Sequence, residues 1–276
     1  MLGNETDILL WMIPLLAATG IAAGILAGLL GIGGGIVIVP ALYYIFSYIG
    51  IDPDVKMHLA VGTSLATIVP TSIRSVRAHQ ERGGFDLELF KAWAPAIVVG
   101  VILGTWLASK ADVGELTAIF GTVGLSASLY MAFGNPEWRL ARHLPRGLAS
   151  IPLPAFIGTI SSMMGIGGGT ISVPALTLFG TPIHRAVGTS AGFGVVIAVP
   201  GFIGFIIAGW NAPNLPPYSA GYVSLIGFAL IVPLTTLAVP WGAKLAHALS
   251  QKALRNAFAI FLGLTSVKML ANSLGV

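Results

Sequence analysis

Long apolar stretches separated by short polar segments dominate the chain. An α-helix rises about 1.5 Å per residue, so roughly 20 apolar residues are needed to cross the ~30 Å hydrocarbon core of a bilayer. The pattern predicts helical membrane segments at 8–30, 36–49, 57–80, 88–109, 114–133, 149–164, 170–180, 184–208, 219–246 and 253–272. The segments at 149–164 and 170–180 are too short to cross alone, which predicts broken or re-entrant helices there.

The composition supports a membrane environment. Of 276 residues, 55% are hydrophobic and 9% are charged, whereas a soluble domain carries roughly a quarter charged residues. This excludes a soluble globular enzyme, a disordered chain and a collagen-like fibre, and it favours an all-α polytopic membrane protein. The net charge is +4, but the cations form short clusters between apolar runs, which argues against nucleic acid as a partner. There is no cysteine, so no disulfide or thiol chemistry is expected.

The two halves of the chain repeat each other. LGIGGGIVIVPAL at 30–42 recurs as MGIGGGTISVPAL at 164–176, and HLAVGTS at 58–64 recurs as HRAVGTS at 184–190. Blocks that recur in the same order at similar spacing indicate an internal duplication. The predicted units, with about five membrane segments in each repeat, are a first repeat at 1–134, a linker at 135–147 and a second repeat at 148–276.

The positive charges predict how the chain is oriented. Cytoplasmic loops carry an excess of Lys and Arg. The region after the first HxAVGTS block is cationic, whereas its equivalent in the second repeat, 209–218, carries no charge. The same element therefore faces the cytoplasm in one repeat and the outside in the other, so the repeats are predicted to be inverted, with both termini outside. The linker is also assigned to the cytoplasm. The cations on that side are Arg74, Arg77, Arg82, Arg139, Arg142, Arg146, Lys244, Lys252 and Arg255.

The paired GIGGG runs predict where a substrate binds. Glycine runs interrupt helices, and their exposed backbone is tolerated at membrane depth only against protein or a watery cavity. We therefore place both GIGGG turns near the bilayer midplane, as the tips of broken hairpins. Inverted repeats with interrupted helices at matching positions are a recurring plan of secondary transporters.

The doubled motif also resembles a known family. GIGGG followed by VP, and then HxAVGTS, occurs twice in this order and is similar to the sulfite exporter TauE/SafE family, over essentially the whole chain. The resemblance implies a secondary transporter of sulfur-containing anions such as sulfite, thiosulfate, sulfoacetate or other organosulfonates, in a cell inner membrane. The first HxAVGTS block has Leu59 where the second has Arg185.

Backbone and hydroxyl donors are the candidate substrate ligands. The N–H groups at a helix N-terminus attract anions, and glycine permits their close approach. The alternative is that the glycines merely let helices cross closely. Hydroxyls of the two GTS sequences can also donate to anion oxygens, or bond back to their own helix. The predicted substrate-binding residues are Gly33, Gly34, Gly35, Thr63, Ser64, Gly167, Gly168, Gly169, Thr189 and Ser190.

Four further residues are candidates for gating, or for contact with protons or anions. His58 and His184 open the HxAVGTS blocks, and the alternative is that they cap helix ends near the membrane surface. Arg185 follows the second histidine. Arg74 lies between two serines near a segment end, where it attracts anions or extends to the inner surface.

Acidic residues are absent from the second repeat and from the middle of the predicted membrane segments. From residue 148 onward the chain has no Asp or Glu, and the acids of the first repeat fall at segment ends or in loops. Proton pumps usually carry a carboxylate inside the membrane, so no carboxylate is expected to be an obligatory proton carrier.

The tryptophans are interpreted as anchors at the membrane interface. They are Trp11, Trp93, Trp106, Trp138, Trp210 and Trp241.

The predicted function is therefore alternating-access transport of a small anion through a lipid bilayer, without cofactor or metal. A passive small-anion channel is the alternative, and whether the protein is a monomer or a homodimer is left open. An intramembrane enzyme is least favoured. His58 and Ser64 lie about 240° apart around one helix, and no orienting acid is nearby.

Overall fold

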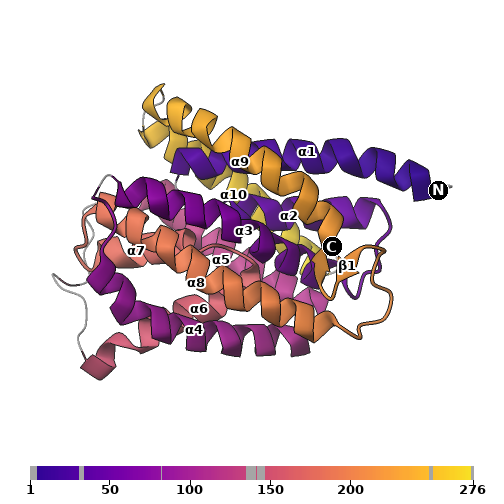
Figure 1. Cartoon of the computed structure of the whole chain (residues 1–276), viewed down its shortest axis with the longest axis horizontal. Coiled ribbons are helices and arrows are strands. Elements are labelled where there is room, and N and C mark those ends of the chain that lie inside the picture. The colour runs from indigo at the N-terminus through magenta and orange to yellow at the C-terminus, as the bar shows by residue number, and fades with distance from the viewer. Residues whose placement is uncertain are drawn as a thin grey trace.

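The computed structural model describes residues 5–30, 34–81, 83–134, 141, 147–248 and 251–274. Within these ranges the chain is helical, apart from one short hairpin and connecting turns (Figure 1). The elements are α1 (Glu5–Leu30), α2 (Gly35–Tyr48), α3 (Lys56–Gln80), α4 (Leu87–Lys110), α5 (Val113–Phe133), the 3₁₀ turn η1 (Gly147–Ser150), α6 (Pro152–Met164), α7 (Gly169–Leu178), α8 (Ile183–Gly209), β1 (Ser219–Ala220), β2 (Val223–Ser224), α9 (Leu225–Ala248) and α10 (Gln251–Ser273).

The predicted segments correspond one to one with these helices. The largest difference is at 219–246, where the helix begins only at Leu225. The preceding residues form an antiparallel hairpin in which Ser219 pairs with Ser224. The chain reverses here because Tyr218 and Gly221 adopt positive φ angles of 58° and 52°, which a continuing helix does not allow.

Local sequence signals explain several helix ends. Asp86 begins α4, and its side chain accepts a hydrogen bond from the Leu89 N–H. Asp112 and Glu115 form a capping box at the start of α5. Pro152 stands at the first position of α6, where its missing N–H costs nothing. Gly165 ends α6 in the left-handed conformation, with φ of 67°.

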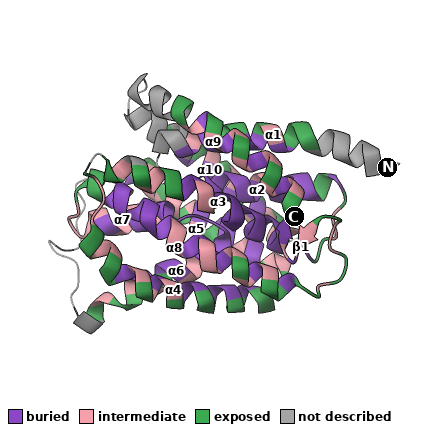
Figure 2. Cartoon of the chain, in the orientation of Figure 1, coloured by how far each residue is buried: buried purple, intermediate pink, exposed green. Residues whose placement is uncertain are grey.

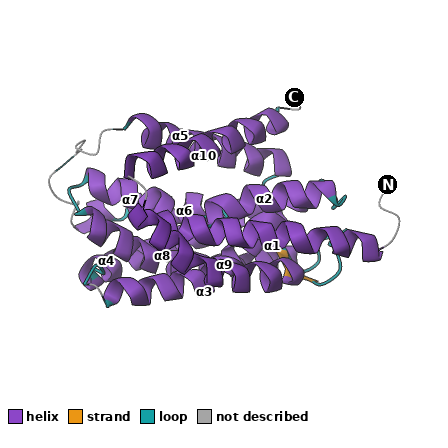
Figure 3. Cartoon of the chain, turned by 90° about the horizontal axis from the view of Figure 1, so that it is seen from above, coloured by secondary structure: helices purple, strands orange, loops and turns teal. Residues whose placement is uncertain are grey.

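Three helix pairs surround a central pair. α3 packs along α8, and around them α1 packs on α9, α4 on α6, and α5 on α10. The α5–α10 pair lies along one side of the bundle (Figure 3). Glycines permit these close crossings. A Cβ atom on Gly24 of α1 would lie 2.5 Å from the Thr235 carbonyl oxygen, and one on Gly100 of α4 would lie 2.0 Å from that of Ala155.

Apolar side chains cover much of the outside of the bundle. On α4, for example, Val99, Ile102 and Trp106 are 64%, 62% and 58% exposed, and Figure 2 shows the exposed face of this helix. In the described part of the chain, four helices are long and apolar enough to cross a membrane: Lys56–Arg77, Leu87–Lys110, Val113–Phe133 and Ile183–Gly209. Such an exposed apolar surface is stable in lipid and unstable in water.

The tryptophans do not all serve as interface anchors. Trp106, Trp210 and Trp241 are more than half exposed, as an anchor requires, but Trp93 is 2% exposed. The interpretation is therefore wrong for Trp93, whose ring stacks on Phe193 of α8 at 5.7 Å between centroids. The side chains of Trp11 and Trp138 lie outside the described part.

Candidate functional site

Gly35, the last residue of the first glycine run, meets the second run, 165–169, between α3 and α8. A Cβ atom on Gly35 would lie 2.8 Å from the Gly165 carbonyl oxygen and 3.1 Å from Cα of Ile166. One on Gly168 would lie 2.9 Å from the Ser190 carbonyl oxygen on α8. Residues separated by more than 100 positions thus share one buried region, and side chains on these glycines would not fit there without rearrangement.

Each run begins a short helix. Gly34, with φ of 69°, precedes α2, and its carbonyl accepts hydrogen bonds from Val37 and Ile38. Gly168 precedes α7, and its carbonyl accepts from the Ser172 N–H at 3.0 Å. The first N–H groups of a helix have no partner within it and carry a partial positive charge. These two helix starts are therefore suited to an anion.

The remaining predicted glycines are placed as follows. Gly167 and Gly169 are buried in the second run. Gly33 lies outside the described residues, so its predicted role is not addressed by the structure. In the sequence, the only reason to assign these glycines to one site was that the GIGGG run occurs at matching positions in both halves. In the structure, Gly35 and Gly165 are in direct contact.

The two serines of the GTS sequences are both fully buried but differ in their hydrogen bonds. The Ser64 hydroxyl donates to the Gly165 carbonyl at 2.7 Å, which fastens α3 to the second glycine run. The Ser190 hydroxyl has no hydrogen-bond partner among the described residues. Equivalent positions in the two repeats therefore have different capacities to bind a ligand.

The two threonines of the GTS sequences make equivalent contacts at opposite ends of the α3–α8 pair. Thr63 Oγ1 accepts from the Ser224 N–H at 2.8 Å, and Thr189 Oγ1 accepts from the Asp86 N–H at 3.0 Å. Ser224 directly precedes α9, and Asp86 directly precedes α4. Each threonine thus holds the start of a long helix, and its hydroxyl proton can still donate to another group.

The glycines beside these threonines were missed by the sequence analysis. A Cβ atom on Gly62 would lie 2.1 Å from the Tyr222 carbonyl oxygen, and one on Gly188 would lie 2.3 Å from that of Gly84. The sequence signal that could have indicated their importance is that both HxAVGTS blocks contain this glycine. We call the contacts of Gly62 and Thr63 with 222–224 the first clasp, and those of Gly188 and Thr189 with 84–86 the second clasp.

The two histidines lie in different surroundings. His58 is 5% exposed. Its Nε2 is 3.0 Å from the Ala108 carbonyl, and its ring stacks on Tyr222 at 4.9 Å. Its Nδ1 has no partner in the part of the chain that is described. His184 is exposed at the start of α8. Burial raises the pKa of the Tyr222 phenol above its ordinary value.

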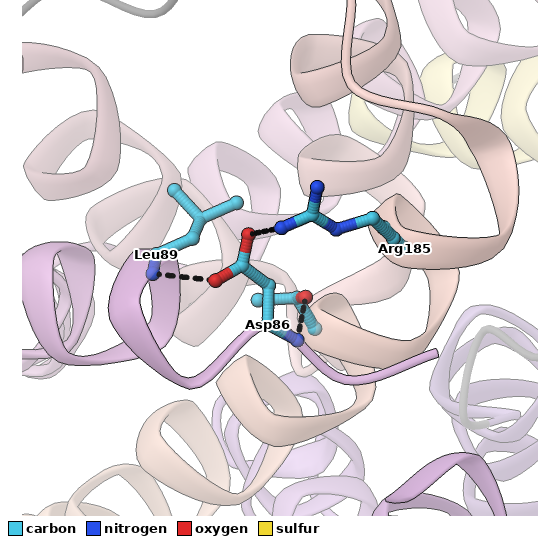
Figure 4. Close-up of polar contacts among 4 residues, drawn as sticks. Asp86, Leu89 and Arg185 are labelled. Atoms are coloured by element: carbon cyan, nitrogen blue, oxygen red, sulfur yellow. Dashed lines mark hydrogen bonds and ion pairs between the residues drawn. The ribbon is translucent and has the colours of Figure 1, made fainter. Parts of the chain in front are cut away.

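The two candidate arginines are both on the surface. Arg185 is 54% exposed and forms an ion pair with Asp86, which is 17% exposed. Figure 4 shows this pair, together with the Asp86 bonds that begin α4. The ion pair adds a charged contact to the second clasp. Arg74 is exposed near the end of α3.

Comparison with known proteins identifies the family. The model of the sulfite exporter TauE/SafE family matches residues 16–269. A probable membrane transporter protein of Haemophilus influenzae is 34% identical over 250 residues, which cover 91% of this chain and 95% of that protein. One of Methanocaldococcus jannaschii is 31% identical over 269 residues, covering 95% and 96%. No solved structure matches the chain. Together with the apolar helical bundle, these matches establish that the chain belongs to the TauE/SafE family of membrane transporters.

Proposed function

We propose that this protein is a secondary transporter that moves small sulfur-containing anions, such as sulfite, thiosulfate, sulfoacetate or other organosulfonates, across an inner membrane by alternating access. The observation that carries the proposal is the contact between the two glycine runs, each of which begins a short helix. α6 and α7, with 13 and 10 residues, are each too short to cross a bilayer. The contact therefore lies at membrane depth, near the midplane.

The packing supports a pair of inverted repeats, 1–134 and 148–276, joined by the linker 135–147. Gly62 near the start of α3 and Gly209 at the end of α8 both contact Tyr222. Gly84, which follows α3, contacts Gly188 near the start of α8. α3 and α8 therefore run in opposite directions although they carry the same motif. The pairs α1–α9 and α6–α4 also correspond to each other under exchange of the repeats.

Charge supports the orientation. The described residues at the end with the second clasp carry more cations than acids: Arg74, Arg77, Lys91 and Arg185 against Glu81, Asp86 and Glu88. The other end carries more acids: Asp52, Asp54, Asp112 and Glu115 against Lys56, Lys110 and Lys268. By the positive-inside rule the second clasp faces the cytoplasm. Both termini then face the outside.

Two clasps at opposite ends suit an alternating-access cycle. In this cycle the substrate binds where the glycine runs meet, with Gly33, Gly34, Gly35, Gly167, Gly168 and Gly169 supplying backbone N–H groups. The first clasp opens to one side of the membrane and the second to the other. Thr63, Ser64, Thr189 and Ser190 connect the central site to the clasps, and His58, His184, Arg185 and Arg74 contact ions at the two mouths.

The test is flux in liposomes that contain only the purified protein. Sulfite, thiosulfate, sulfoacetate and an aryl sulfonate are each loaded on one side. A transporter gives saturable uptake that is accelerated by the same anion on the opposite side. Linear, voltage-driven conductance without counter-exchange would identify a channel, and chemical conversion of the anion would identify an enzyme. Absence of flux for all four anions would overturn the proposed substrate class.

A further inference from the structure

Four buried hydroxyls without partners occur on the helices around the second glycine run. They belong to Ser161 on α6, Thr170 and Ser172 on α7, and Ser190 on α8, and each side-chain oxygen lacks a hydrogen-bond partner among the described residues. Ser161, Ser172 and Ser190 are 0% exposed and Thr170 is 8% exposed. A buried hydroxyl without a partner is unfavourable, more so at membrane depth, so such groups are rare unless they bind something.

Backbone contacts place all four beside the same turn. The Ser161 carbonyl accepts from the Ile166 N–H at 3.0 Å, and the Ser172 N–H donates to the Gly168 carbonyl at 3.0 Å. The Ser190 carbonyl lies 2.9 Å from the position of a Cβ atom on Gly168. Thr170 belongs to the first turn of α7. Three helices therefore contribute residues with unpartnered hydroxyls next to 165–169.

The start of α7, like these hydroxyls, offers hydrogen-bond donors that favour an anion. Its first N–H groups are free of intrahelical partners, and its dipole favours negative charge. The second repeat contains no Asp or Glu that would repel an anion. Hydroxyl and N–H donors around a helix start suit a small anion with several oxygen acceptors.

Among the described residues, the helices beside Gly34 and Gly35 lack an equivalent set of unpartnered hydroxyls. The positions equivalent to Ser161, Thr170 and Ser172 are Ala27, Ile36 and Ile38, which are buried and apolar. Ser64, the equivalent of Ser190, has its hydroxyl bound to the Gly165 carbonyl. The two copies therefore differ: the second carries four unpartnered hydroxyls, whereas three of the equivalent positions in the first are apolar and the fourth, Ser64, is already bonded to protein.

We infer that the oxyanion is bound asymmetrically, by the N–H groups that begin α7 together with the hydroxyls of Ser161, Ser190 and one of the α7 pair Thr170 and Ser172, which lie about 200° apart around that helix. The first glycine run contributes backbone N–H groups only, because the side chains beside it are apolar. This inference rests on the proposed function, because it assigns the ligands of the transported anion. The anion is recognised by its oxygen atoms, which sulfite, thiosulfate and organosulfonates share.

The test measures anion affinity and melting temperature on the same purified proteins in lipid nanodiscs. The anions are sulfite, thiosulfate, sulfoacetate, sulfate, phosphate and nitrate, as sodium salts. The variants are Ser172→Ala, Ser190→Ala, Ser161→Ala and Thr170→Val, with the buried Ser128→Ala and the exposed Ser126→Ala as controls. Removal of a hydroxyl that contacts the anion is expected to weaken affinity roughly tenfold. The melting temperature without anion should stay the same or rise, because an unpaired buried hydroxyl is removed.

The controls should keep the affinity of the wild type. Ser128→Ala should lower the melting temperature, since its buried hydroxyl donates to the Ala259 carbonyl at 2.7 Å. Ser126→Ala should change neither, because its hydroxyl is exposed and bonds to its own helix.

Each outcome decides between the two proposals. If the wild type binds a sulfur anion and the four variants bind it equally well, the asymmetric site is wrong and the transport proposal stands. If only another oxyanion binds, and binding depends on Ser161, Ser190 and either Thr170 or Ser172, the sulfur substrate is wrong and the site stands. If the wild type binds none of the six anions, both proposals are wrong.

Discussion

Ser64 of the first repeat and Gly165 of the second are joined by a hydrogen bond of 2.7 Å between side-chain hydroxyl and backbone carbonyl, across 101 positions of the chain. The carbonyl belongs to the glycine that ends α6 with φ of 67°. The bond thus fixes the turn of one repeat to the central helix of the other. Its position gives the two halves a shared core, although each carries its own copy of the motif.

Ser64→Ala should destabilise the protein by about 1–3 kcal/mol, because it leaves the buried Gly165 carbonyl without this donor. The measurement is the melting temperature of the purified protein in detergent. Ser126→Ala is the matched control, since that hydroxyl is exposed and bonds within its own helix. Equal melting temperatures for the two variants would show that the bond contributes nothing to stability.

Gly62→Ala and Gly188→Ala should each destabilise the protein by about 3 kcal/mol or more. The added methyl groups would meet backbone carbonyls at 2.1 Å and 2.3 Å, and these carbonyls cannot move without opening a clasp. Gly201→Ala is the control, because its methyl group would meet only side-chain atoms of Leu65, the nearest at 3.0 Å, which lie outside both clasps. Yield and melting temperature of all three variants, prepared in parallel, test this order.

Cysteine labelling tests the orientation of the chain. The protein has no native cysteine, so Asn214→Cys and Arg77→Cys each present one thiol. Both positions are exposed and belong to opposite ends of the α3–α8 pair. An impermeant thiol reagent applied to whole cells should label the first and spare the second, while both should react after the cells are permeabilised. The reverse pattern would overturn the orientation.

Asp86→Asn should leave any proton dependence of transport intact while weakening closure of the second clasp. Asn keeps an oxygen that can cap α4 but loses the charge that pairs with Arg185. The measurement is flux in liposomes with and without a pH gradient, with the double variant Asp86→Asn/Arg185→Gln as a control for the unpaired arginine. Selective loss of the pH response in the folded single variant would make Asp86 a proton carrier, against our expectation for all carboxylates.

Most helices could be predicted from the sequence because a helix in lipid needs a long apolar stretch, and such stretches are visible in the hydrophobic pattern. The start of α9 was misplaced since an apolar hairpin and an apolar helix look alike in sequence, and only the positive φ angles at Tyr218 and Gly221 separate them. Trp93 was misjudged because burial between helices and exposure to lipid both favour an aromatic side chain.

The candidate site was predictable only in part. The duplicated motif indicated Ser64 and Ser190 together, but their different partners depend on contacts between distant segments. Thr63 and Thr189 were expected to face the substrate, and their bonds to Ser224 and Asp86 leave that role a prediction. Gly62 and Gly188 were missed although both HxAVGTS blocks contain them, because the sequence does not show which carbonyl of another segment approaches each glycine.

The ion pair of Asp86 and Arg185 makes the two ends of the α3–α8 pair respond differently to salt. Attraction between partly exposed charges weakens as ionic strength rises, since screening at 0.15 M already acts within ~8 Å. The opposite end is held by the Thr63 bond to a backbone N–H and by the stacking of His58 on Tyr222, which involve no ion pair. We therefore expect high salt to loosen the end that holds Asp86 and to leave the opposite end intact. In the proposed transport cycle, ionic strength alone would then bias the end at which the protein opens.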